Sequence, residues 1–156
     1  MTEDKNQPLR SIEELGEFAL IDHLTAHFET RRSETLKSIG DDAALLDMGD
    51  QKTVLSTDML VEGIHFNLSY MPMRHLGYKS VVVNLSDICA MNARPTHITV
   101  SISVSNRFSL EALEAFYQGV NDACAHYKVD LVGGDTTASL KGMTISVTAI
   151  GSVSEE

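Results

Sequence analysis

Two segments that alternate strictly between apolar and polar residues place the tightest limits on how this chain folds. Every second residue from Ile98 to Val104 is branched and apolar, and the residues between them are threonine or serine. The segment from Met143 to Ala149 alternates in the same way. A period of two is typical of a strand with one buried face. We therefore expect two sheet strands whose second face carries hydroxyls and lines either an interface or a cavity.

Three other segments have the apolar spacing of amphipathic helices. The first follows a predicted capping box at 11–14 and runs to about Phe28, the second opens at Pro72, and the third is capped by Ser109. Shorter strand-like runs lie at 43–48, 52–57 and 129–132. Helices linking strands predict an α+β domain with two layers, a mixed β-sheet and helices on one face. Residues 1–10 are polar and predict a flexible tail before a single domain at 11–156.

The runs 43–48 and 52–57 are separated by Gly49 and Asp50, a turn signal that predicts a β-hairpin. Antiparallel pairing across a short turn would place the start of the first strand beside the end of the second. The prediction therefore brings Asp42 close to Asp58.

Four polar sites share one character, a carboxylate at the border of an apolar run. They contain Asp42, Asp58 (after Ser56 and Thr57), Asp87 and Asp135. Asp87 falls on a helix that is apolar over most of its circumference, so we expect it to be buried and to need a partner. Each site taken alone is more typical of a turn or a helix cap, and only the four together favour a common ligand.

Our hypothesis is that the four carboxylates converge on a metal ion. Two carboxylates roughly 6 Å apart repel by about 3 kcal/mol at an effective dielectric constant near 20, a cost that a divalent cation removes. Oxygen ligands without a Cys or His pair at zinc spacing select Mg²⁺, Mn²⁺ or Ca²⁺.

The charge balance narrows the class of partner. The chain has 12 basic and 22 acidic residues and a formal charge of −10, which argues against a nucleic-acid or anionic-membrane surface, although ordinary solubility also explains it. No apolar run has the length of a membrane span or a signal peptide, so we expect a cytoplasmic protein. Cys89 and Cys124 lie in apolar helical patterns and predict buried free thiols.

Five short motifs occur in an order that resembles one enzyme family. They are Gly-Glu-Phe at 16–18, Gly-Asp-Asp-Ala-Ala at 40–44, Ser-Thr-Asp at 56–58 followed by Glu-Gly-Ile-His-Phe at 62–66, Asn-Leu-Ser-Asp at 84–87, and Gly-Gly-Asp-Thr-Thr at 133–137. In this set the chain resembles the N-terminal half of the thiamine-monophosphate kinases. Their superfamily also holds aminoimidazole ribonucleotide synthetase and selenophosphate synthetase.

The resemblance implies a function and a set of site residues. ATP would phosphorylate thiamine monophosphate to thiamine diphosphate, and no catalytic base is needed because the acceptor phosphate is already ionised at neutral pH. Mg²⁺ would be held by Asp42, Ser56, Thr57, Asp58, Asp87 and Asp135. Gly134 and Asp135 would contact the nucleotide, and His65 would contact thiamine monophosphate, although the sequence alone fits a packing histidine equally well.

The same resemblance implies a homodimer formed through the open sheet face. Family members continue for another domain, so we expect this chain to be the N-terminal domain and to be inactive alone. Three alternatives remain open at this point: a non-catalytic metal-binding dimerisation module, a metal-dependent phosphohydrolase, and a related ATP-using synthetase.

Overall fold

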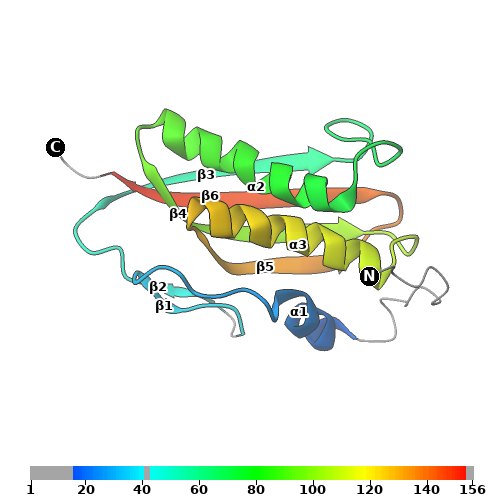
Figure 1. Ribbon diagram of the computed structural model, residues 1–156, viewed down its shortest axis with the longest axis horizontal. Coiled ribbons are helices and arrows are strands. Elements are labelled where there is room, and N and C mark those ends of the chain that lie inside the picture. The colour runs from blue at the N-terminus through cyan, green and yellow to red at the C-terminus, as the bar shows by residue number, and fades with distance from the viewer. Residues whose placement is uncertain (1–15, 41–42, 154–156) are drawn as a thin grey trace, which may run out of the picture.

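The computed structural model describes residues 16–40 and 43–153, which form a layer of helices on a four-stranded sheet, with a small two-stranded sheet beside it (Figure 1). In chain order the elements are α1 (Glu17–Thr25), β1 (Thr35–Lys37), β2 (Leu45–Leu46), β3 (Lys52–Val61), α2 (Met73–Ala90), β4 (Arg94–Val104), α3 (Leu110–Tyr127), β5 (Asp130–Ala138) and β6 (Met143–Val153).

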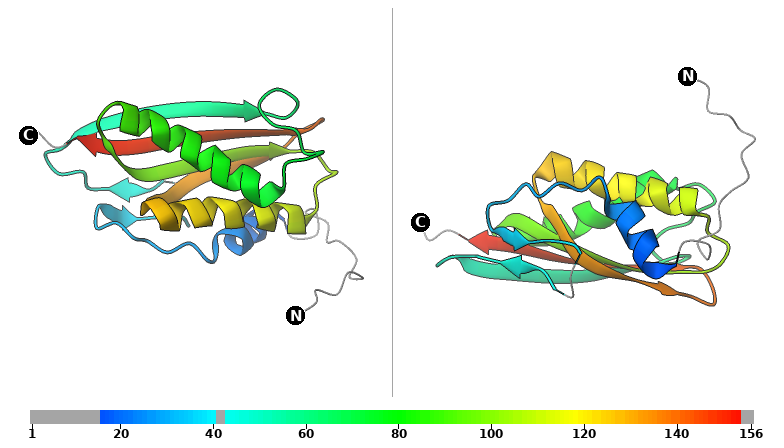
Figure 2. Two further views of the ribbon diagram at one scale, coloured as in Figure 1. Left: turned by 45° about the horizontal axis from the view of Figure 1, so that its top comes forward. Right: turned by 90° about the horizontal axis from the view of Figure 1, so that it is seen from below.

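The main sheet has the strand order β3-β6-β4-β5. β6 is antiparallel to both β3 and β4, whereas β4 and β5 are parallel. α2 connects β3 to β4, α3 connects β4 to β5, and both helices cover the same face (Figure 2). The predicted α+β fold, a mixed sheet with helices on one face, is confirmed.

The alternation in β4 and β6 separates the two faces of the sheet. Ile98, Val100 and Ile102 are buried under the helices, and Ile145 and Val147 of β6 are buried beside them. The intervening hydroxyl residues are only partly buried. Neither α2 nor α3 covers this hydroxyl-rich side, which we call the open face.

Two glycines allow α2 and α3 to pack closely. A Cβ added at Gly77 would lie 2.0 Å from the carbonyl oxygen of Phe116, and one added at Gly119 would lie 1.9 Å from that of Arg74. Both distances are far below van der Waals contact, so only glycine fits at this helix crossing. The predicted helix starts are also confirmed, with Pro72 as the N-cap of α2 and the Ser109 side chain accepting a hydrogen bond from the Ala112 amide.

The predicted hairpin of 43–48 with 52–57 is wrong. β2 pairs antiparallel with β1 in a separate two-stranded sheet, and β3 pairs along its whole length with β6. The turn itself forms, with the Gly49 amide donating to the Asp47 side chain at 3.0 Å. It connects two different sheets, because continuous pairing with β6 offers β3 many more backbone hydrogen bonds than a short hairpin would.

Several element boundaries also differ from the prediction. The structure describes α1 only over Glu17–Thr25, shorter than the predicted 11–28, while the proposed capping box and the tail at 1–10 lie outside the described residues. β5 does not end at Val132 but continues through both glycines to Ala138.

Two predicted burials are wrong. Asp87 and Cys89 are exposed, because the buried side of this end of α2 is carried by Leu85 and Ile88, and neither Asp87 nor Cys89 lies on that side. Cys124 is buried as expected, and burial raises its thiol pKa to about 12, which makes it a poor nucleophile. Within the described ranges, no helix combines the length and apolar character needed to cross a bilayer.

Candidate functional site

Two of the predicted ligand residues meet at the β3 edge of the sheet. Ser56 Oγ donates a hydrogen bond to Asp87 Oδ2 at 3.2 Å, although the residues are 31 positions apart. Ser56 lies opposite Ala149 in the register of β3 with β6, and Asp58 lies opposite Val147. Both side chains therefore belong to the face that carries α2. Ser56, Asp58 and Asp87 form a group of oxygen donors that suits a hard divalent cation.

Thr57 lies on the opposite side of β3. Its Oγ1 donates to the carbonyl oxygen of Val147 at 3.2 Å and accepts a hydrogen bond from Thr148 Oγ1 at 3.1 Å. The three consecutive residues at 56–58 therefore divide between the two faces, as the period of a strand requires. A single ion could reach all three only around the strand edge.

The other predicted residues lie on β5, at the far edge of the sheet. A Cβ at Gly134 would fall 1.8 Å from the carbonyl oxygen of Val100, so a side chain is excluded there by the neighbouring strand. Gly134 and the exposed Asp135 line an open cleft of about 500 Å³ between β5, α1 and the segment after β1. The cleft is lined by Ile21, Asp22, Thr25, Ile39, Gly40, Ala43, Ala44, Val100, Tyr117 and residues 131–136.

Tyr117 is a cleft residue that sequence reasoning missed. It is buried, its ring packs edge-on against Phe28 and Phe116, and its hydroxyl hydrogen-bonds with Thr136. Burial raises the pKa of Tyr117 to about 12; the hydrogen bond to Thr136 opposes this and the Asp135 charge adds to it. The available signal was a tyrosine inside the apolar stripe of a helix, where the hydroxyl needs a polar partner.

The sheet separates the two groups. Asp58, Val147, Val100 and Gly134 lie in one row across the four strands. Three strand spacings put the ends of that row about 14 Å apart. In the described part of the chain, no group of three or more His, Cys, Asp or Glu side chains is placed to hold a metal ion.

The predicted convergence is therefore not assembled by the described carboxylates of one chain. Asp42 lies outside the described residues, but Gly40 and Ala43 line the cleft at β5. With the hairpin absent, the inference that Asp42 lies beside Asp58 loses its basis. The metal-binding role of these residues stays a prediction.

His65 lies just beyond the end of β3 and is exposed. The Val61 amide donates to His65 Nδ1 at 3.0 Å, so a neutral ring carries its proton on Nε2. Lys79 Nζ donates to the His65 carbonyl oxygen at 3.1 Å and holds the turn against α2. The free Nε2–H is available to an external acceptor.

Comparison with known proteins gives one family match and several close relatives. Residues 40–153 match the family model described as AIR synthase related protein, N-terminal domain. A thiamine-monophosphate kinase of Bacillus subtilis is 36% identical over 141 residues, which is 89% of this chain and 43% of the relative.

Solved structures of thiamine-monophosphate kinases also resemble this chain. A thiamine-monophosphate kinase from Stenotrophomonas maltophilia superposes with a TM-score of 0.73 at 39% identity, covering 89% of this chain and 43% of the other. A structure described as AaThiL complexed with AMPPCP and TMP has a TM-score of 0.63 at 35% identity, covering 96% and 45%. This chain thus spans less than half the length of the relatives it matches. It belongs to the AIR synthase-related family, as an N-terminal domain of that kind.

Proposed function

We propose that this chain is the N-terminal part of a kinase that transfers a phosphoryl group from ATP to thiamine monophosphate and forms thiamine diphosphate. The observation that carries the proposal is the cleft at β5, where Gly134 and Asp135 stand in the Gly-Gly-Asp motif. Relatives of 36% and 39% identity are named for this activity, and a third was crystallised with AMPPCP and TMP.

In the proposal, the nucleotide lies along β5. Gly134 has no side chain, because the Val100 backbone occupies the position of its Cβ, so the backbone of Gly134 is open to a phosphate or ribose in the cleft. Asp135 is exposed beside it and would reach the phosphates only through a cation, because two anionic groups repel each other.

Mg²⁺ is the proposed cation, with ligands from Asp42, Ser56, Thr57, Asp58, Asp87 and Asp135. The described members of the set offer oxygen atoms only, and the Ser56–Asp87 hydrogen bond already orients two of them at the β3 edge. When bound, such ions neutralise the charge that develops on the transferred phosphoryl group.

The acceptor in the proposed reaction is the phosphate of thiamine monophosphate. A phosphate monoester is largely ionised at neutral pH, so the chain does not need a general base to remove a proton from it. His65 would donate from Nε2–H to that phosphate, and the Val61 amide fixes the tautomer that makes this possible.

The two ligand groups, about 14 Å apart by strand spacing, require something to bring them together. We propose that a second copy of the chain covers the open face, and that the rest of the kinase supplies further contacts. Leu55 and Met59 are 64% and 59% exposed on the outward side of β3, which is apolar surface that such an interface would bury.

Isothermal titration of ATP into the chain, with and without Mg²⁺, tests the proposal. We expect Mg²⁺-dependent binding that is weakened at least tenfold by Asp135→Asn and by Asp87→Asn, since each removes one charged ligand worth about 1.5–3 kcal/mol. The matched control is Asp122→Asn, which removes a carboxylate paired with Arg74 on the helix layer. Binding that is equal with and without Mg²⁺, or equally weakened by the control, would contradict the proposal.

A further inference from the structure

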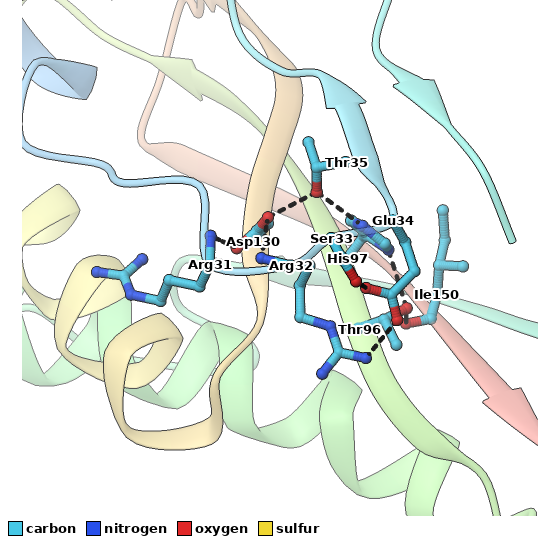
Figure 3. Close-up of polar contacts among 9 residues, drawn as sticks. All are labelled: Arg31, Arg32, Ser33, Glu34, Thr35, Thr96, His97, Asp130 and Ile150. Atoms are coloured by element: carbon cyan, nitrogen blue, oxygen red, sulfur yellow. Dashed lines mark hydrogen bonds and ion pairs between the residues drawn. The ribbon is translucent and has the colours of Figure 1, made fainter.

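A buried polar cluster at the amino ends of β4 and β5 plays no part in the function proposed above (Figure 3). Asp130 is 1% exposed, and Thr96 and His97 are fully buried. Buried ionisable groups are costly unless they are satisfied by hydrogen bonds, so their partners indicate what the cluster holds in place.

Asp130 holds the start of β1 and the residues just before it. Its Oδ1 accepts from the Arg31 backbone amide at 2.7 Å, and its Oδ2 accepts from the Arg32 amide at 3.1 Å. The Thr35 hydroxyl donates to the same Oδ2 at 2.6 Å. One carboxylate on β5 therefore fixes three positions of a segment that is 95 to 99 residues away in sequence.

His97 extends the cluster into the sheet. Its Nε2 lies 3.0 Å from Thr35 Oγ1, and its Nδ1 lies 2.9 Å from Thr96 Oγ1. The Thr96 hydroxyl in turn donates to the Ile150 carbonyl oxygen at 3.1 Å. The chain of contacts from Thr35 to Ile150 joins the start of β1 to β4 and β6, as Figure 3 shows.

The held segment leads directly into the wall of the nucleotide cleft. Three residues after Thr35, Ser38 Oγ donates to the Leu131 carbonyl oxygen at 3.2 Å. The next two residues, Ile39 and Gly40, line the cleft opposite residues 131–136 of β5. The cleft therefore has one wall on β5 and another that is attached to β5 through Asp130.

We propose that Asp130, Thr35 and His97 are positioning residues that set the distance of the Ile39–Gly40 wall from β5 and thereby the affinity of the cleft for Mg·ATP. None of the three lines the cleft, so they act through the segment they hold. The inference rests on the proposed function for its ligand. Its structural half, the coupling of the cluster to Ile39 and Gly40, is measurable without any ligand.

The test compares two substitutions at one site in the chain of 156 residues. Thr35→Val keeps the shape of the side chain and removes the hydroxyl, whereas Thr35→Ser keeps the hydroxyl. Asp130→Asn is the stronger second variant, and Asp122→Asn is the control for loss of a carboxylate outside the cluster. The measurements are amide exchange at Arg31 and Arg32, NMR chemical shifts of Ile39 and Gly40, and the Kd for Mg·ATP.

We expect Thr35→Val to move the Ile39 and Gly40 resonances and to weaken Mg·ATP binding about fivefold to tenfold, the range of one hydrogen bond. Thr35→Ser should restore both, and Asp130→Asn should also speed exchange at Arg31 and Arg32. A cluster that only stabilises the fold would lower the Tm in Thr35→Val and leave the Ile39 and Gly40 resonances and the Kd unchanged, which would overturn the proposal.

The two proposals fail in different ways. A wild-type chain that does not bind Mg·ATP counts against the proposed function, and the positioning role is then decided by the Ile39 and Gly40 resonances alone. If Asp130→Asn does not fold, the Thr35 pair still gives the answer.

Discussion

The two faces of the main sheet differ in how much change they can accept. On the helix-covered face, residues such as Val100 and Val147 are buried, and glycines at the α2–α3 crossing leave no space for one more carbon atom. On the open face, hydroxyl side chains are only partly covered. Close packing on one face fixes the fold, and this leaves the other face and the sheet edges available for binding.

The largest expected effect is on the rate of phosphoryl transfer and concerns the open face and the sheet edges. We expect the chain alone to phosphorylate thiamine monophosphate at least about 10⁵-fold more slowly than a complete relative, because enforcing in-line geometry contributes roughly 7–11 kcal/mol. In the described part of the chain the two groups of proposed ligands lie at opposite edges of the sheet, so we expect that donor and acceptor are not held in line. ADP formation that depends on thiamine monophosphate is the measurement.

The kinase from Stenotrophomonas maltophilia, assayed under the same conditions, is the reference for that rate. Equal rates for the two proteins would mean that the open face and the edges already form a complete site.

The next largest effect is expected on the oligomeric state, if the open face is an interface between two copies of the chain. We expect the wild-type chain to be a dimer in light scattering, and Ser146→Lys to be a monomer. Ser146 lies mid-sheet between Met59 and Ser101, where a charge brought against a second copy would cost several kcal/mol. Gln118→Lys adds the same charge to the exposed side of α3 and should leave the dimer intact. A wild-type monomer at tens of micromolar would refute the interface.

A smaller effect is expected on the unfolding free energy when a methyl group is added on each side of the sheet. Gly119→Ala should lower the free energy of unfolding by about 2–3 kcal/mol, because the new Cβ meets the Arg74 backbone and the helices must separate. Gly133→Ala is the matched control, since its Cβ would come no closer than 3.8 Å to the Thr99 side chain. Urea unfolding of both variants measures the difference, and equal losses would show that the helix crossing is not tight.

Much of the fold follows from the sequence because local periodicity and the core agree. The alternation in β4 and β6 and the caps at Pro72 and Ser109 are all realised. The hairpin prediction failed because a turn signal reports only the local reversal of the chain. Which strand β3 pairs with is decided by β6, which lies more than 80 residues further along the sequence.

The candidate site shows a different limit. Short motifs identify oxygen donors, and Ser56 with Asp87 are indeed brought into contact. Sequence cannot give the lateral order of strands, so it could not place Asp58 and Asp135 at opposite edges of the sheet. Asp130 and His97 were missed because each is a single residue in an apolar strand pattern, and their partners lie on a segment without regular spacing.

The smallest expected effect is a pH dependence of the unfolding free energy, caused by the buried His97. Burial is the main influence on His97 and lowers its pKa, the Asp130 and Glu34 carboxylates oppose the shift, and Arg32 adds to it. With the folded pKa below the unfolded value near 6.5, the unfolded chain binds more protons as the pH falls through that value. The stability that His97 contributes is therefore full above about pH 6.5 and decreases towards the folded pKa.

Urea unfolding at about pH 7.5 and 5.5 should accordingly show a larger loss of unfolding free energy for wild type than for His97→Gln, because only the wild-type chain carries the lowered pKa of the buried ring. His126→Gln, which removes an exposed histidine from the last turn of α3, should follow the wild-type curve. A His97→Gln variant with the same pH dependence as wild type would mean that His97 keeps its unfolded pKa in the cluster. The carboxylates of Asp130 and Glu34 would then offset the whole cost of burying the ring.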